Sequence, residues 1–171
     1  MSGSDERSWP ARERRGARDR RSGFDRRDEK AWQSVPLEAE KSADLRLVEA
    51  ATRARLHAQA PYSGFKVGAA LELTDGGIVS GCNIENASYS LTICAERVAL
   101  VKALSEGQVA FTRIAVVADT TAPTPPCGPC RQLLWEYCGD IEVILANLDG
   151  PAGRHRLSAL LPLPFDGRLL T

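Results

Sequence analysis

Two short segments, Cys94-Ala95-Glu96-Arg97 and Pro126-Cys127-Gly128-Pro129-Cys130, decide how this sequence is interpreted. Each follows a predicted β-strand and begins a predicted helix, and one apolar strand at 112–118 separates them. If the strands are parallel and the crossovers are right-handed, both helices begin at the carboxyl edge of the sheet. The three thiols then meet in one crevice, at the place where open α/β sheets bind ligands.

The rest of the sequence predicts further elements around these two segments. Hydrophobic spacing and turn residues predict a helix over 42–60, strands over 67–73 and 78–83 joined by a tight turn at 74–77, helices over 94–105 and 128–138, a strand over 141–146, a turn at 148–151 and a short helix over 157–165. Helices that alternate with buried strands favour an α/β fold. The expected architecture is a three-layer α/β/α domain, and the hairpin makes its sheet mixed.

Three cysteines without a nearby histidine suit zinc, which binds thiolates readily. Three protein ligands (Cys94, Cys127 and Cys130) leave a fourth tetrahedral position for water, as in catalytic zinc sites. Glu96 lies on the first helical turn beside Cys94, where a carboxylate can move protons to and from a metal-activated water. Arg97 is expected to donate hydrogen bonds to the sulfurs and so withdraw charge from them.

Each of these features has an ordinary explanation when taken alone. Cys-x-x-Cys also occurs in redox pairs and structural zinc sites, and a single cysteine is more often a buried core residue. Glu96 and Arg97 alone would be an ordinary pair of charged residues at the N-terminus of a helix. Cys-x-Glu followed about 30 residues later by Pro-Cys-x-x-Cys is, however, a known signature of zinc deaminases.

Composition limits the class of protein further. The 171 residues contain 22 basic and 22 acidic side chains, which argues against nucleic-acid or membrane binding through the whole surface. No apolar run is long enough for a transmembrane helix, and no apolar signal-peptide core follows Met1. The odd number of cysteines, five, argues against a disulfide framework. These features predict a cytoplasmic protein.

Residues 1–38 differ in composition from the rest of the chain. The first 30 residues contain ten Lys/Arg and seven Asp/Glu but few apolar side chains. Such a segment cannot bury enough apolar surface to offset its ordering entropy. We predict a disordered charged arm over 1–38, either a solvated tail or an arm that binds RNA or a partner, and a single domain over 39–171.

Residues 42–166 resemble the cytidine deaminase family, specifically its short-chain homotetrameric form with a three-cysteine zinc site. The matching stretches are APYSGFKVGAA at 60–70, GCNIENASY at 81–89, CAER at 94–97, PCGPCRQ at 126–132 and LLPLPF at 160–165. The family usually has Ala where this chain has Pro129. Proline is tolerated at an early helix position because its missing N–H is not needed there.

The resemblance implies one zinc ion per chain, held by the three cysteines, with Glu96 as the catalytic proton shuttle. It also implies substrate contacts for five residues. Asn83 and Glu85 would bind the ribose, Phe65 would line the pyrimidine pocket and the backbone at Ala95 would bind the base edge. Phe165 would reach the site of a neighbouring subunit. The implied reaction is hydrolytic deamination of cytidine and 2′-deoxycytidine in pyrimidine salvage.

Four other interpretations stay open at this point. A deaminase acting on bases in RNA or DNA is disfavoured because the arm lacks regularly spaced aromatic residues for stacking. A deaminase of a nucleoside antibiotic matches the ribose segment less well. A non-catalytic zinc module needs a fourth protein ligand, and a thiol oxidoreductase leaves Cys94 and Glu96 without a role.

Overall fold

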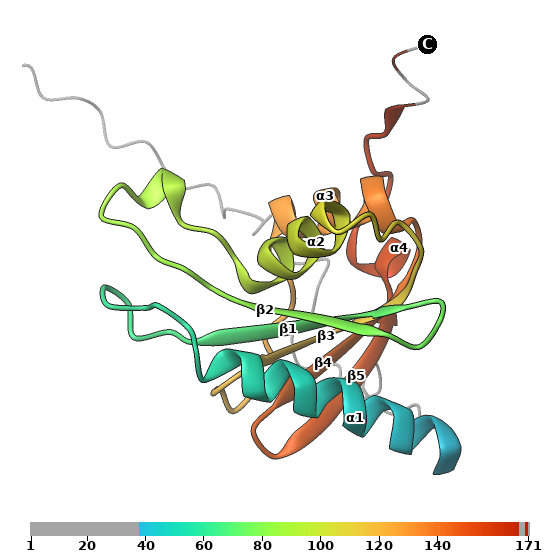
Figure 1. The fold of residues 1–171 in the computed structure, drawn as a ribbon, viewed down its shortest axis with the longest axis horizontal. Coiled ribbons are helices and arrows are strands. Elements are labelled where there is room, and N and C mark those ends of the chain that lie inside the picture. Colours follow the sequence, from blue (N-terminus) through green and yellow to red (C-terminus); the bar gives the residue numbers. More distant parts are fainter. Residues whose placement is uncertain (1–37, 168–169, 171) are drawn as a thin grey trace, which may run out of the picture.

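The computed structural model describes residues 38–167 and 170, and it arranges them as one mixed sheet with helices on both faces (Figure 1). The predicted arm at 1–38 lies outside the described residues except for Glu38, which begins the first helix. The elements in chain order are α1 (Glu38–Arg55), β1 (Val67–Leu73), β2 (Ile78–Cys82), a 3₁₀ helix (Tyr89–Leu91), α2 (Ala95–Ser105), β3 (Phe111–Ala118), α3 (Gly128–Cys138), β4 (Glu142–Asn147), β5 (Gly150–Arg156) and α4 (Leu157–Leu160). No helix in the described part has the length and apolar character needed to cross a membrane.

The strand order of the sheet is β2-β1-β3-β4-β5. Strand β1 pairs antiparallel with both β2 and β3, so β2 and β3 run in the same direction. Strands β3 and β4 are parallel and are connected through α3. Helices α2 and α3 therefore both begin at the edge of the sheet where β2 and β3 end, as the sequence predicted.

The two faces of the sheet pack against different helices, which confirms the three-layer α/β/α fold. Side chains alternate between the faces along each strand. In β3, Ile114 and Val116 face the layer of α2 and α3, whereas Ala115 and Val117 face α1. The face toward α1 is lined by small or β-branched residues, and the opposite face has larger aliphatic ones.

Gly68 in β1 lets α1 approach the sheet closely. A Cβ atom at this position would lie 1.9 Å from the Ala51 carbonyl oxygen and 2.7 Å from the Arg55 amide nitrogen. Both are backbone atoms, so relief requires the helix to move. We expect Gly68→Ala to lower the free energy of unfolding by about 3 kcal/mol, measured by chemical denaturation. Gly167→Ala, whose nearest atom is 4.0 Å away, is the matched control and should be close to neutral.

Helix α1 begins earlier and ends earlier than the predicted 42–60. Residues 38–41 are Glu, Ala, Glu and Lys, which have good helix propensity and extend the helix at its start. At the other end, 3₁₀-type hydrogen bonds tighten the last turn, from Leu56 to Arg53 and from His57 to Ala54. Gln59 then forms a β-bridge with Ile84, which removes it from the helix.

The prediction for residues 148–165 was wrong in two respects. Residues 150–156 form β5, an edge strand antiparallel to β4, where the sequence analysis placed only a turn. The last helix ends at Leu160 and does not reach Phe165. Pro162 and Pro164 explain the early end, because neither can donate a helical hydrogen bond.

Candidate metal centre and active site

Two helix N-termini hold the cysteines that the sequence analysis singled out. Cys94 is the N-cap of α2 and Cys127 is the N-cap of α3, and both have extended backbone angles. Cys130 lies on the first turn of α3 and is fully buried. Pro129 lies in the same turn and leaves the start of α3 intact, as expected.

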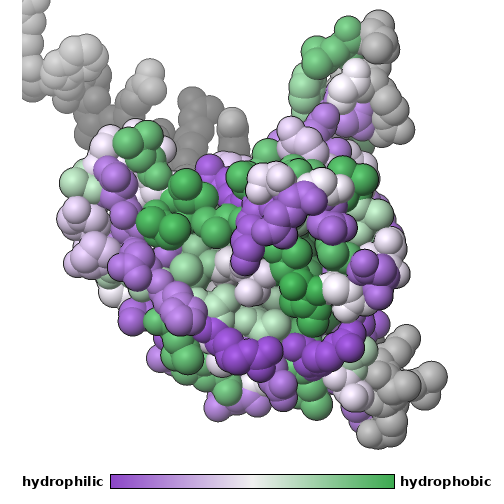
Figure 2. Space-filling view, in the orientation of Figure 1, coloured by the Kyte–Doolittle hydropathy of each residue, from purple (hydrophilic) through white to green (hydrophobic). Residues whose placement is uncertain are grey.

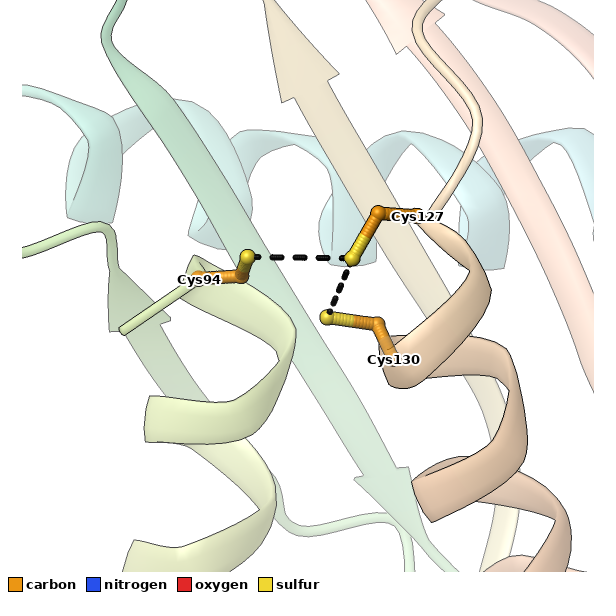
Figure 3. A group of neighbouring side chains, drawn as sticks. All are labelled: Cys94, Cys127 and Cys130. Carbon is orange, nitrogen blue, oxygen red and sulfur yellow. Dashed lines mark hydrogen bonds between the residues drawn. The ribbon is translucent and has the colours of Figure 1, made fainter. Parts of the chain in front are cut away.

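The three thiols converge as predicted (Figure 3). The Sγ atoms of Cys94 and Cys127 are 3.8 Å apart, and those of Cys127 and Cys130 are 3.3 Å apart. All three lie within 4.8 Å of one another. Zn–S bonds of about 2.3 Å in a tetrahedron give S···S edges of about 3.8 Å, so the cluster fits a zinc ion. Cys127 is exposed, which leaves the cluster open to solvent on one side.

The thiols have strongly different electrostatic environments. Hydrogen bonds from the Cys130 thiol and then from Arg97 lower the pKa of Cys94 to about 5. The same hydrogen bond to Cys94, together with burial, raises the pKa of Cys130. The positive ends of two helix dipoles also favour thiolates at this place. The cluster is therefore suited to a cation.

Glu96 lies beside the cluster. Its side chain is 4% exposed, and burial raises the pKa of its carboxyl. The Cys130 thiol lies within hydrogen-bonding reach of the carboxylate. A buried carboxylate next to an open cation site is placed to accept and return protons.

Arg97 contacts the cluster from α2. Its Nη2 atom donates to the Cys94 sulfur at 3.6 Å and to the Thr92 carbonyl oxygen at 3.5 Å. A cation beside a ligating thiolate reduces the charge that the thiolate places on a metal. The contact with Cys94 is the one that the predicted role of Arg97 requires, and the role itself stays a prediction.

We expect Arg97→Ala to lower zinc affinity or kcat/KM by about tenfold to a hundredfold, because donors to metal ligands have effects of this size. Competition with a chromophoric chelator and steady-state turnover measure the two quantities. Arg53→Ala, on the exposed surface of α1, is the control. Unchanged turnover together with unchanged zinc content in Arg97→Ala would rule out this role.

The predicted ribose-binding residues, Asn83 and Glu85, both make hydrogen bonds to the loop between α1 and β1. The buried side chain of Asn83 accepts from the Val67 amide and donates to the Phe65 carbonyl oxygen, both at 2.8 Å. Glu85 accepts from the Tyr62 amide at 2.9 Å and from the Ser63 amide at 3.2 Å. It also accepts from the Ser63 hydroxyl, and these donors lower its pKa. Both residues thus fix the segment 62–67.

The remaining predicted residues occupy three different environments. Ala95 is fully buried at the first position of α2, and Phe65 is exposed at the end of the loop that Asn83 fixes. Phe165 is exposed on the irregular segment after α4. Cys82 and Cys138 are absent from the thiol cluster in the described part of the chain, and burial raises the pKa of Cys138 to about 12.

Sequence reasoning gave no role to Ser63, Arg131 or Gln132. Ser63 donates to Glu85 and accepts from the Phe65 amide. Arg131 and Gln132 directly follow Cys130. Arg131 donates to the carbonyl oxygens of Pro126 and Leu160, and Gln132 donates to that of Phe165. Their position on the first turn of a ligand-bearing helix was the available signal.

Comparison with known proteins agrees with this geometry. Residues 41–146 match the family described as the cytidine and deoxycytidylate deaminase zinc-binding region. The fold and the thiol cluster therefore define a zinc-dependent enzyme of the deaminase class, and zinc is the metal for Cys94, Cys127 and Cys130.

Individual relatives narrow the class. The chain is 54% identical to a cytidine deaminase of Halalkalibacterium halodurans over 120 residues, which are 70% of this chain and 91% of the relative. It is 50% identical to a cytidine deaminase of Sporosarcina psychrophila over 121 residues, 70% of this chain and 89% of the relative. The crystal structure of cytidine deaminase from Burkholderia pseudomallei superposes with a TM-score of 0.68 at 50% identity, covering 70% of this chain and 97% of that one. The chain belongs to the cytidine deaminase family.

Proposed function

We propose that the chain catalyses the zinc-dependent hydrolytic deamination of cytidine and 2′-deoxycytidine, and so serves pyrimidine salvage. The products are uridine or 2′-deoxyuridine and ammonia. One observation carries the proposal: three thiols at two helix N-termini lie beside a buried carboxylate, with one side of the cluster open. The domain over 39–171 would be the catalytic unit.

The cysteines and Glu96 have separate roles in the proposed reaction: the cysteines bind the metal and Glu96 transfers protons. Cys94, Cys127 and Cys130 would hold one zinc ion per chain, and Arg97 would moderate the charge of the sulfurs. When bound, zinc supplies the Lewis acidity that makes water a nucleophile near neutral pH.

Glu96 moves two protons in turn. It takes one from the attacking water and delivers it to N3 of the pyrimidine, while the water oxygen bonds to C4. It then takes the proton of the new hydroxyl and transfers it to the 4-amino nitrogen. The C4–N bond breaks, ammonia leaves and a carbonyl remains at C4, so one water is consumed for each ammonia released.

Hydrogen-bonding capacity supports a free ribose hydroxyl as the ligand of Asn83 and Glu85. Glu85 already accepts three hydrogen bonds, which leaves about one of its four acceptor positions. The Asn83 amide retains one N–H and one lone pair. A hydroxyl that donates to Glu85 and accepts from Asn83 fits this capacity. An esterified 3′ oxygen has no proton to donate, which argues against oligonucleotide substrates.

Exposed apolar side chains support association between copies of the chain, which we propose to be a homotetramer. Tyr89 is 75% exposed, Leu91 is 63% exposed, and Tyr62 packs edge-on against Tyr89. Apolar residues gathered on a surface mark interaction sites. We propose that copies of the chain bury these residues together. Phe65 and the Ala95 backbone would contact the pyrimidine from the chain's own site, and Phe165 from a neighbouring copy.

The state of the cysteines supports a reducing compartment. All five are free thiols, and three of them serve as metal ligands in this proposal. Because disulfides form in oxidising compartments, this pattern is typical of the cytoplasm.

Metal analysis with a substrate panel tests the proposal. Purified full-length protein is expected to contain one zinc per chain and to release ammonia from cytidine and 2′-deoxycytidine, followed by absorbance. A single-stranded cytidine-containing oligonucleotide should give at least about a hundredfold less, because its 3′ oxygens are esterified. Faster deamination of the oligonucleotide, or activity in metal-free protein, would overturn the proposal.

A further inference from the structure

The segment after α4 leaves the body of the domain beside α3 and extends away from it (Figure 1). Its residues 161–166 are irregular, and Leu163 has φ of +53°, an uncommon value for a bulky residue. Leu163 is 99% exposed and Phe165 is 57% exposed. In the space-filling view the molecule has a projection at the upper right, with hydrophobic residues on its surface (Figure 2).

Two consecutive side chains on α3 bind the end of α4 and the segment that follows it. The Arg131 guanidinium donates to the Leu160 carbonyl oxygen through Nη1 and to the Pro126 carbonyl oxygen through Nε, both at 2.7 Å. Gln132 Nε2 donates to the Phe165 carbonyl oxygen at 2.6 Å. Cys130 directly precedes these two residues on α3, so the segment is attached next to a member of the thiol cluster.

Gln132 holds the segment at Phe165, the residue whose ring is proposed to contact the substrate. Pro162 and Pro164 have no amide proton, so main-chain donation cannot hold the segment at either residue. The bond from Gln132 is made to the main chain of Phe165, which leaves the ring free to project. A hydrogen bond at this carbonyl therefore fixes the main chain from which the ring projects, without burying the ring.

We infer that Gln132 is a positioning residue, which holds the Phe165 main chain so that the ring reaches the nucleoside site of a neighbouring copy. This inference rests on the proposed function of Phe165. Gln132 itself touches no substrate. Its contribution appears as substrate affinity, since a ring that is not held must lose conformational freedom when the nucleoside binds.

A double-mutant cycle tests the inference. Gln132→Glu replaces the donor with an acceptor that faces a carbonyl oxygen, and Gln132→Met removes the donor without adding charge. Each is expected to raise KM for cytidine about fivefold with kcat within about twofold, the size expected for one hydrogen bond. Gln108→Glu, at an exposed position outside the sheet and the site, is the charge-matched control and should leave KM unchanged. Zinc content and oligomer mass should equal those of the parent protein in all of them.

Phe165→Ala provides the reference. It should raise KM at least as much as Gln132→Glu, and the double variant should be no worse than Phe165→Ala alone, because Gln132 acts through that ring. Additive effects in the double variant, or a Gln132→Met protein with the parent KM, would overturn the inference and leave the proposed function intact. A Phe165→Ala protein with the parent KM would overturn both the inference and the proposed role of Phe165. A parent protein inactive on cytidine would overturn the proposed function and the inference together.

Discussion

Glu96→Gln is expected to lower kcat for cytidine by about a thousandfold or more while the protein still binds one zinc per chain. The amide has the size of the carboxylate and can occupy the same buried place, but it cannot accept a proton from water or return one to the amino group. Glu96 is not needed as a ligand, because the three sulfurs form the cluster without it. The substitution thus separates proton transfer from metal binding.

Steady-state turnover and metal analysis on the same sample measure this separation. The control is Glu106→Gln, the same chemical change at the exposed C-terminal end of α2. It should retain the parent kcat. A Glu96→Gln protein with more than about a tenth of the parent kcat would show that another group moves the protons. Loss of zinc would instead make Glu96 part of the metal site.

The parts of the fold that local sequence determines were predicted closely. The bounds of β1 were correct, since an apolar run is followed there by a Thr-Asp-Gly-Gly turn. Helix α3 also matched its predicted bounds, because Pro129 and Gly139 mark its start and end. The convergence of the cysteines followed from topology alone, once both helices were predicted to begin at one edge.

Strand β5 was missed because its residues have little strand propensity of their own. Gly150, Pro151 and Gly153 are depleted in strands, and the burial pattern of β5 does not alternate. An edge strand needs only one partner, and β4 provides it with a register that runs from Asn147 to Glu142. Pairing with a buried neighbour therefore outweighs local preference in this segment.

Ion pairs and hydrogen bonds between polar side chains distant in the chain were beyond prediction, unlike the convergence of the cysteines. Asp44 is 3% exposed and accepts hydrogen bonds from Arg113 at 2.8 Å and from Arg154 at 2.7 Å. The sequence separations are 69 and 110 residues, so no local pattern relates these charges. The hydrogen bond from Ser63 to Glu85, at a separation of 22 residues, is the equivalent case in the proposed substrate site. Such pairs exist only after the sheet has formed.

Cys127→Ala is expected to abolish zinc binding and with it detectable deamination. Two sulfurs cannot complete the site, because Cys94 and Cys130 are on separate helices and Cys127 lies between them at 3.8 and 3.3 Å. Since a zinc ion held by these cysteines would join the starts of α2 and α3, its loss should also lower the thermal midpoint of unfolding. Metal analysis, turnover and thermal unfolding of the full chain measure the three effects.

The effect of zinc and of a chelator on the thermal midpoint provides the control for the Cys127→Ala experiment. A strong chelator should lower the thermal midpoint of the parent protein to about that of Cys127→Ala, and added zinc should raise the midpoint only in the parent, because only its folded state binds the ion tightly. Cys82→Ala makes the same chemical change outside the thiol cluster and should keep one zinc per chain. A Cys127→Ala protein with full zinc content and full turnover would contradict the three-sulfur site. An ion that binds only the folded state must stabilise that state. A parent protein whose thermal midpoint is the same with and without chelator would therefore contradict the contribution of the metal to stability.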